Sequence, residues 1–320
     1  MAYYSFGAAI FHYSNRVELK LMQPVAKSFM CAKVSLVKRG ETVQQMLSFG
    51  LNHMTVPRSS ARNLLDLAAA LGCVGIELRN DLGGAIFDGI SPAEFGAAAQ
   101  DAGLRILALA EVKLFNIDPP GKAHVARDLI QTAAACGAEG VALIPWVGET
   151  VIDRPAQRDA LRVALKVMQP VLEDHGMVGL IEPLGFINSS LRFKEDVVAV
   201  LDDLDRPACF RIVHDTFHHH LAGSSAVYPE LTGLVHISGI SDPVPSTNEM
   251  TDAHRVLVDT HDRLGNVAQL RALRAGGYAG PASLEVFAPE IHDIHDPATA
   301  LAGSLAFITS QLTDHSAVRA

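Results

Sequence analysis

Short runs of aliphatic and β-branched residues alternate with longer amphipathic stretches from about position 45 to the end of the chain. Runs of this kind, bounded by glycine or polar residues, are typical of buried strands. Their alternation with helices predicts βαβ units and a parallel sheet. The predicted strands are Leu47–His53, Val74–Leu78, Arg105–Ala110, Gly140–Ile144, Val178–Glu182, Phe210–Asp215, Leu234–Ile237 and Ala282–Val286.

Helix-boundary signals lie between these runs. Ser91 and Pro92 predict an N-cap followed by proline at the first helical position, with Glu94 in the first turn. Eight strand–helix units without a glycine-rich dinucleotide loop favour one closed (β/α)8 TIM barrel, an α/β fold, over a doubly wound sheet. We expect this barrel over residues 46–320. Five glycines predict C-caps just before strands: Gly72, Gly103, Gly137, Gly176 and Gly277.

The first 45 residues differ in composition from the rest of the chain. They carry six basic residues, all between Arg16 and Arg39, against only Glu18 and Glu41. We interpret residues 1–45 as an N-terminal extension that takes no part in the barrel, with Met46 as the natural beginning of the domain. A transit peptide is the alternative, because acidic residues are sparse there.

Composition narrows the class of protein. The 320 residues are 49% hydrophobic and carry a net charge of −9, which fits a large core and argues against a nucleic-acid partner. The four cysteines are scattered and form no CxxC pair, so we expect neither disulfides nor a zinc–thiolate site. No apolar run reaches the roughly 18 residues of a membrane span. We expect a cytoplasmic protein with a small-molecule substrate and no membrane partner; a homo-oligomer stays open.

Polar residues stand at the ends of the predicted strands, where a TIM barrel carries its active site. The last four strands supply Glu182, Asp215, His236 and Glu285. Several buried carboxylates at one barrel mouth need a compensating charge, and one divalent cation would supply it. Carboxylate and imidazole ligands suit Mn²⁺, Mg²⁺, Co²⁺ or Zn²⁺. Taken singly, Asp215 could instead cap the following helix, and Glu285 could form an ion pair on the rim.

A histidine cluster follows the sixth predicted strand in the segment HDTFHHHLAG. His218 lies three residues after Asp215 and is placed to turn back over the metal and bind a substrate oxygen. His219 is expected to face solvent or to pack on a helix, and His214 to point away from the barrel lumen. Only part of this cluster therefore belongs to the predicted site.

Several segments together resemble the xylose-isomerase-like TIM barrels, among them LNHMTV, GIELRN, LIEPLG, DTFHHHLAG, LVHIS, TDAHRV and GPASLEVF. The likeness runs from about Met46 to the C-terminus and, within the family, is greatest to inosose isomerases. It places the family's metal ligands on the four strand-end residues, its substrate-oxygen histidine on His218 and its loop arginine on Arg255. The segments LVDTHDRLGN and HISGIS depart from the family pattern beside the substrate.

The resemblance implies a metal-dependent isomerase that shifts a proton on a sugar-like α-hydroxyketone, with a keto-inositol as substrate. Glu182 and Glu285 would be the acid–base pair, and His218 and Arg255 would stabilise oxyanion charge. Ketose 3-epimerisation and inosose dehydration begin with the same proton abstraction and stay open, as does a non-catalytic, metal-dependent sugar-binding protein. Further candidate substrate contacts are Asn52, Glu77, Lys113 and, as an apolar wall, Trp146.

Overall fold

The computed structural model describes residues 47–313. The predicted extension, residues 1–45, lies outside the described residues, so its separation from the barrel stays a prediction. The described segment belongs to one compact unit that begins at Gln45.

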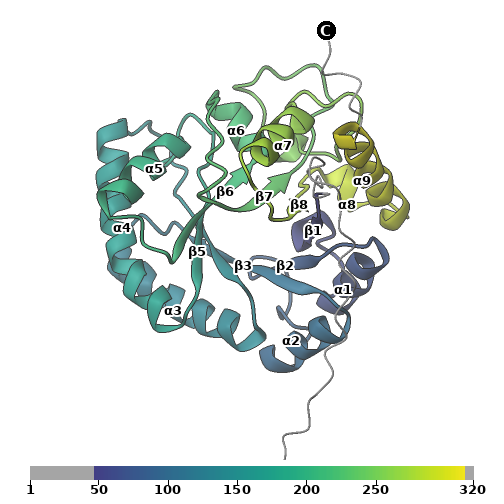
Figure 1. Cartoon of the computed structure of the whole chain (residues 1–320), viewed down its shortest axis with the longest axis horizontal. Coiled ribbons are helices and arrows are strands. Elements are labelled where there is room, and N and C mark those ends of the chain that lie inside the picture. The colour runs from purple at the N-terminus through teal and green to yellow at the C-terminus, as the bar shows by residue number, and fades with distance from the viewer. Residues whose placement is uncertain (1–46, 314–320) are drawn as a thin grey trace, which may run out of the picture. The chain divides into compact units, whose positions relative to one another are not determined.

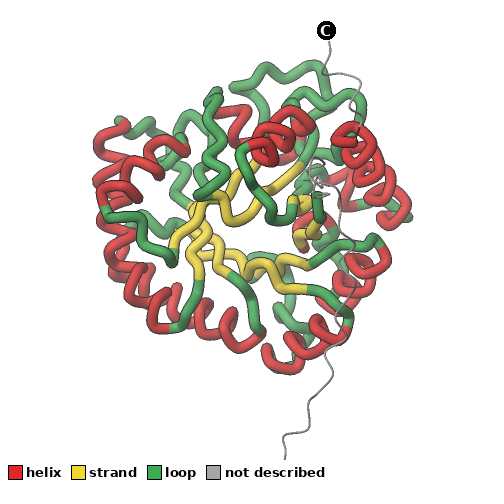
Figure 2. Tube along the Cα trace, in the orientation of Figure 1, coloured by secondary structure: helices red, strands yellow, loops and turns green. Residues whose placement is uncertain are grey.

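Eight parallel strands pair in chain order and close into a barrel, as predicted (Figures 1 and 2). Closure is made by β1 and β8, where Phe49 pairs with Ala282 and Leu51 with Leu284. The strands are β1 Phe49–Asn52, β2 Gly75–Arg79, β3 Arg105–Lys113, β4 Gly140–Ile144, β5 Val178–Ile181, β6 Phe210–Asp215, β7 Thr232–Ile237 and β8 Ala282–Leu284.

Helices surround the barrel as an outer layer (Figure 1). Two 3₁₀ turns, η1 His53–Thr55 and η2 Asp252–His254, lie in the loops after β1 and β7. The α-helices are α1 Ala61–Ala70, α2 Pro92–Asp101, α3 Pro119–Cys136, α4 Arg154–Asp174, α5 Lys194–Asp203, α6 Thr216–Ala222, α7 Asn266–Ala275, α8 Pro289–His292 and α9 Pro297–Thr313. Among the described residues, none of these helices combines the length and apolarity needed to cross a bilayer.

The residues predicted to begin and to end helices are found at those positions. The Ser91 hydroxyl accepts a hydrogen bond from the backbone N–H of Glu94, and the Glu94 carboxylate accepts one from the backbone N–H of Ser91, which makes a capping box. Gly137 ends α3 with a φ of 73°, a left-handed conformation that glycine adopts without strain.

Some strand ends differ from the prediction. The predicted third strand stopped at Ala110, but β3 continues to Lys113 past an irregular register between Leu109 and Val112. The polar residue Glu111 therefore lies within the strand, and the Asn80 side chain binds both its backbone N–H and its carbonyl. The predicted first and eighth strands were too long, because η1 begins at His53 and β8 ends at Leu284.

The described residues form three apolar core clusters, two of which contain residues of the barrel strands. A large apolar cluster fills the space between the strands and the helices, and a smaller one, Leu107, Ala108, Leu180, Val213 and Leu234, forms a second cluster among the strands. Residues that point outward along a strand thus bury against helices, whereas polar residues at the carboxyl ends of the strands are held at the barrel mouth.

Candidate metal centre

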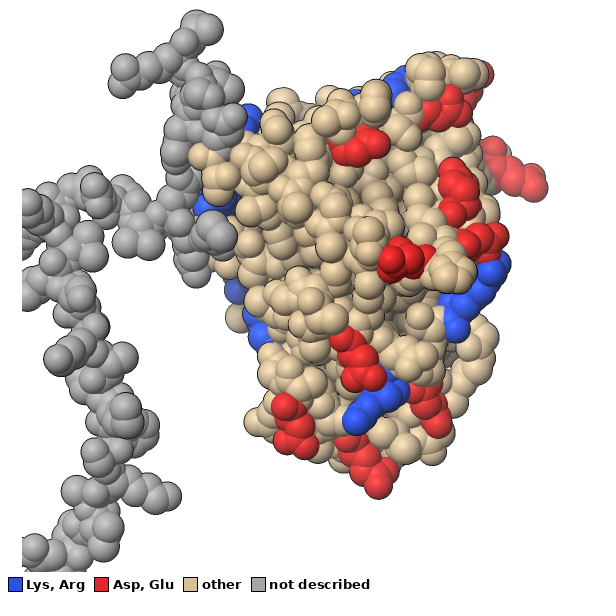
Figure 3. All heavy atoms as spheres, turned by 90° about the vertical axis from the view of Figure 1, so that its right-hand side faces the viewer, with Lys and Arg blue, Asp and Glu red and all other residues tan. Residues whose placement is uncertain are grey.

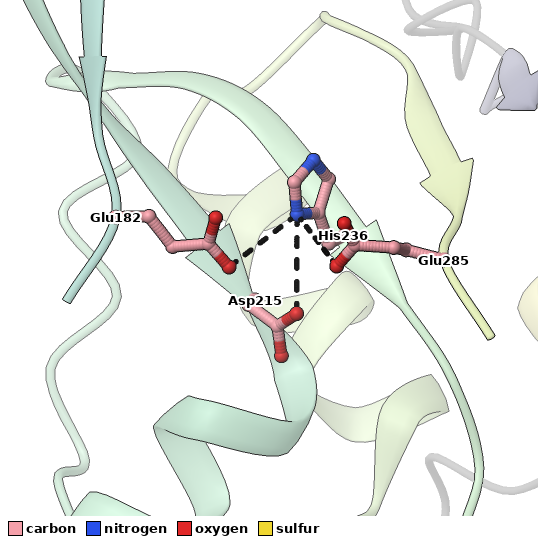
Figure 4. Close-up of side chains that lie close together, drawn as sticks. All are labelled: Glu182, Asp215, His236 and Glu285. Atoms are coloured by element: carbon pink, nitrogen blue, oxygen red, sulfur yellow. Dashed lines mark ion pairs between the residues drawn. The ribbon is translucent and has the colours of Figure 1, made fainter. Parts of the chain in front are cut away.

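Four side chains from consecutive strands converge at the mouth of the barrel. Ligand atoms of Glu182, Asp215, His236 and Glu285 all lie within 4.8 Å of one another, and all four residues are buried. The His236 Nδ1 atom faces the three carboxylates, at 3.5 Å from Glu182, 3.9 Å from Asp215 and 3.2 Å from Glu285 (Figure 4). The structure brings together the four residues selected from the strand ends.

The local fold explains this convergence. Glu182 and Glu285 directly follow β5 and β8, Asp215 ends β6, and His236 lies one residue before the end of β7. Asp215 is in register with His236 across the β6–β7 pair. Because parallel strands end at the same edge of the barrel, four polar residues that are far apart in sequence meet at one point.

Asp215 caps a helix and also belongs to the cluster of four candidate ligands. Asp215 Oδ1 accepts a hydrogen bond of 3.0 Å from the backbone N–H of His218, which caps α6. Its other oxygen, Oδ2, faces His236 and accepts a bond of 2.6 Å from Arg255. One carboxylate therefore both starts the helix and faces the candidate ion site.

Glu77 sets the orientation of the His236 ring. His236 Nε2 lies 3.0 Å from Glu77 Oε2, an acceptor that holds a proton on Nε2. A neutral His236 would therefore present the lone pair of Nδ1 to the three carboxylates. The Nδ1 atom of His236 is buried and has no hydrogen-bond partner among the described residues. A carboxylate that orients a histidine in this way is typical of metal sites. The orphaned nitrogen and the three carboxylates fit a divalent cation.

Glu182 and Glu285 lie in opposite electrostatic surroundings. Burial raises the pKa of Glu182 despite the nearby His236. Burial alone would also raise the pKa of Glu285, but His236, Arg255 and Arg79 outweigh it and lower that pKa well below its usual range. Burial of His236 is likewise outweighed by Glu285, Glu77 and Glu182, which raise its pKa well above the ordinary value.

Arg255 reaches the cluster from the loop after β7. Its side chain is 1% exposed, and its Nη2 donates to Asp215 and Glu285 at 2.6 and 3.0 Å. The Ser238 hydroxyl accepts from its Nε at 2.9 Å, and the Phe287 ring lies 4.5 Å beneath the guanidinium. The loop arginine singled out in the sequence is thus placed against two of the four candidate ligands.

A pocket of about 320 Å³ opens beside the cluster. Glu182 and Glu285 form part of its wall, together with His218, Lys113 and Arg255. The His218 ring meets the Phe186 ring edge-on, with centroids 5.1 Å apart. Lys113 lies at the open side, with 65% of its side chain exposed and its Nζ 3.2 Å from Glu111.

Three other residues predicted to contact substrate lie outside the lining of this pocket. Asn52 donates to Glu285 at 3.2 Å, and Glu77 binds His236, so both hold candidate ligands in place. Trp146 is half-buried; its backbone binds Asn116 and Ser190 in the loop after β4.

Sequence reasoning did not assign several residues that line the pocket, among them Arg79, Glu111, Phe186 and Phe287. Arg79 donates to Glu285 at 3.0 Å and forms a two-bond pair with Asp81. Arg79 and Glu111 directly follow the predicted strands Val74–Leu78 and Arg105–Ala110, and a polar residue at such a position was the available signal. The apolar wall comes from Phe186 and Phe287, whose loop positions carry no periodicity that would have revealed them.

Comparison with known proteins agrees with the fold. The sequence profile of the xylose isomerase-like TIM barrel family matches residues 65–311, so the chain belongs to this family. No curated protein matches the chain.

Solved structures share the architecture. A xylose isomerase domain containing protein of Salmonella typhimurium LT2 is 26% identical, with a TM-score of 0.75 over 85% of this chain and 98% of the other. The IolI protein with a bound zinc atom is 21% identical, with a TM-score of 0.75 over 83% and 99%. D-allulose 3-epimerase of Methylomonas sp., in complex with D-allulose, is 20% identical, with a TM-score of 0.65 over 83% and 98%. At these identities the last two likenesses establish the fold.

Proposed function

We propose that this chain is a divalent-metal-dependent isomerase of a small α-hydroxyketone, with a keto-inositol as its substrate. The observation that carries the proposal is the convergence of three buried carboxylates and one imidazole nitrogen beside a pocket of about 320 Å³. Two of those carboxylates, Glu182 and Glu285, form part of the pocket wall. That volume is at the small end of ligand pockets, which suits one polyhydroxylated ring. Membership of the xylose isomerase-like family and a solved sugar epimerase of the same fold support this substrate class.

Glu182, Asp215, His236 and Glu285 would hold the cation, and their oxygen and imidazole atoms suit Mn²⁺, Mg²⁺, Co²⁺ or Zn²⁺. The IolI structure, with its zinc atom, supports a divalent ion in this fold. When bound, such an ion supplies Lewis-acid stabilisation of negative charge on substrate oxygens.

Glu182 is the group that we assign to hold the moving proton. Burial disfavours the charge on its carboxylate, so an Oε atom of Glu182 accepts a proton from the carbon beside the carbonyl and gives it back to the neighbouring carbon. Glu285, held ionised by Arg79 and Arg255, is its partner on the other side of the cluster. Two carboxylates with pKa values driven apart are the usual basis of such a division of roles.

The remaining pocket residues bind and orient the substrate. The His218 ring donates to a substrate oxygen, and its edge contact with Phe186 restricts the ring. Arg255 and Lys113 orient hydroxyl groups, and Phe287 provides an apolar wall. Asn52 and Glu77 act on the chemistry through Glu285 and His236.

Epimerisation beside the ketone is the second candidate, and the likeness to D-allulose 3-epimerase favours it over inosose dehydration. It uses the same residues, with return of the proton to the opposite face. The candidate of another class is a metal-dependent sugar-binding protein without turnover. We also propose a cytoplasmic location, because the described cysteines, Cys73, Cys136 and Cys209, are buried free thiols that suit a reducing compartment.

Proton NMR of the metal-loaded protein with 2-keto-myo-inositol in D₂O tests the proposal. We expect deuterium at the carbon beside the carbonyl together with a new keto-inositol isomer. An epimer or a dehydrated product would establish one of the other two reactions. An unchanged spectrum for this and other small α-hydroxyketones would contradict enzymatic function and leave the binding protein.

A further inference from the structure

A second, much smaller cavity lies behind the carboxyl end of β6, between the start of α5 and the helix α6. Its volume is about 10 Å³, which is the room that a single water molecule needs. Lys194, His218 and His219 all line it, and His218 also lines the large pocket. His218 therefore stands between this cavity and the proposed substrate.

The polar groups around the cavity are buried and incompletely paired. Lys194 is only 5% exposed, and its Nζ has one hydrogen-bond partner within residues 47–313, His214 Nδ1 at 2.6 Å. The Nδ1 atoms of His218 and His219 are buried without a protein partner in the same range. Buried polar groups left unpaired cost free energy, so groups like these are usually satisfied by ordered water.

The direction of the hydrogen bonds follows from Gln269 on α7. Its amide nitrogen donates to the carbonyls of Thr216 and Leu264, so its oxygen must accept from His214 Nε2. His214 Nε2 therefore carries a proton, and His214 Nδ1 lies 2.6 Å from Lys194 Nζ, a nitrogen that carries hydrogen whether charged or neutral. In this pair Lys194 is the donor and His214 Nδ1 is the acceptor.

Lys194 consequently has a spare donor beside the cavity. Burial lowers the pKa of Lys194 to about 7, and both the ammonium and the amine carry at least two N–H groups. One N–H serves His214 and another remains. A water molecule in the cavity can accept from Lys194 and donate its two hydrogens to His218 Nδ1 and His219 Nδ1, which makes the three hydrogen bonds typical of buried water.

We propose that Lys194 is a positioning residue for His218: through one buried water, it fixes the His218 ring with Nδ1 as an acceptor and with the Nε2–H turned to the large pocket. The inference rests on the proposed function only for the role of that N–H, which is to donate to a substrate oxygen. In the other tautomer Nε2 would offer a lone pair to the substrate and the donor would be lost.

The tautomer can be read directly in protein labelled with ¹⁵N-histidine, because long-range ¹H–¹⁵N spectra distinguish protonated from unprotonated ring nitrogens. His218→Asn assigns the His218 signals by their loss. We expect wild-type His218 to carry its proton on Nε2, Lys194→Met to shift it to a mixture, and Lys194→Gln, which keeps an N–H donor, to preserve the wild-type pattern. Lys166→Met, at an exposed position on α4, is the matched control and should change nothing.

The same samples separate this inference from the proposed function. We expect Lys194→Met to lower kcat about tenfold with KM and metal content unchanged, less than the 10²–10³-fold typical of losing a donor outright. Absence of hydroxyketone turnover in the wild type would contradict the proposed function and leave the tautomer result standing. Wild-type His218 protonated on Nδ1, or an unchanged tautomer in Lys194→Met, would overturn the inference. If Lys194→Met does not fold, a high-resolution crystal structure of the wild type decides: a water bound to Lys194, His218 and His219 supports it, and a dry cavity overturns it.

Discussion

Glu182 and Glu285 carry the same functional group, yet each is buried against different neighbours. Glu285 accepts hydrogen bonds from Asn52, Arg79 and Arg255, whereas Glu182 faces His236 and the pocket. Replacing either by Gln keeps an oxygen at the site but removes the base, so each change should lower kcat by about 10²–10⁴-fold.

Stability distinguishes the two variants. Glu285→Gln leaves Arg79 and Arg255 without one of their charged partners in a buried site, which is costly. We expect the Tm of Glu285→Gln to fall below that of Glu182→Gln, measured by thermal denaturation of the metal-free proteins. Equal Tm values, or wild-type turnover in both variants, would contradict this account of the pair.

Replacing His236 and replacing His218 should affect bound metal and turnover differently. His236→Asn removes the nitrogen that faces the three carboxylates, so metal and activity should be lost together. His218→Asn removes a donor to the substrate and should lower kcat by about 10²–10³-fold with metal content intact. Metal analysis beside turnover checks both variants. Loss of metal in His218→Asn with retention in His236→Asn would show that the roles are reversed.

At the scale of single residues, the candidate ligands could be predicted because each ends a strand, and strand ends converge in a barrel. For Asn52 and Glu77, the sequence could not distinguish a side chain that contacts the substrate from one that holds a candidate ligand in place. Both are polar strand-end residues, but only the three-dimensional packing directs them at Glu285 and His236 rather than at the pocket.

Among the elements, α6 carries an acid-sensitive contribution to stability. His219 was predicted to face solvent or to pack on a helix; it is instead buried against the ring of His214 on β6, with centroids 4.7 Å apart. Burial, with Lys194 and His220, lowers the pKa of His219 to about 3. Between about pH 6.5 and 3 the unfolded chain therefore binds more protons at this residue than the folded protein, so stability falls as the pH falls through that window.

His219→Phe should weaken this acid sensitivity. We expect the urea midpoint of the variant to fall less than that of the wild type between pH 7 and pH 4.5, with both proteins metal-free. His214 keeps its own lowered pKa, so part of the pH dependence should remain. Parallel curves for the two proteins would show that His219 does not contribute.

The elements themselves could largely be predicted from hydrophobic periodicity, since all eight strands and the glycine-terminated helices occur where expected. Boundaries were less predictable. The extension of β3 to Lys113 places Glu111 in the sheet, and it depends on pairing with β4 and on the Asn80 side chain rather than on local sequence. Long-range pairing of this kind leaves no signal within a single segment.

At the scale of the molecule, Figure 3 shows charged side chains that are spread over one face rather than gathered into a single patch. On the described part of that face, acidic and basic side chains are interspersed around a broad uncharged area. A small-molecule partner rather than a nucleic acid stays a prediction from the net charge of −9, because a nucleic-acid backbone requires a basic surface.

The barrel closes within the described residues, from Phe49 on β1 to Ala282 on β8. We therefore expect a chain that begins at Met46 to keep the Tm and the activity of the full-length protein. Thermal denaturation and turnover of the two chains, side by side, provide the measurement. Failure of the shorter chain to fold would show that residues 1–45 are needed by the barrel.

Titration of the metal-depleted protein with a divalent cation tests the central claim most directly. Proton exchange on 2-keto-myo-inositol is recorded as Mn²⁺ or Zn²⁺ is added, with His236→Asn as the matched control. We predict that exchange is absent after metal removal, returns in proportion to added ion and stops increasing at one ion per chain, while His236→Asn stays inactive. Full exchange in the metal-depleted protein, or one bound ion per chain without exchange on any small α-hydroxyketone, would contradict the account.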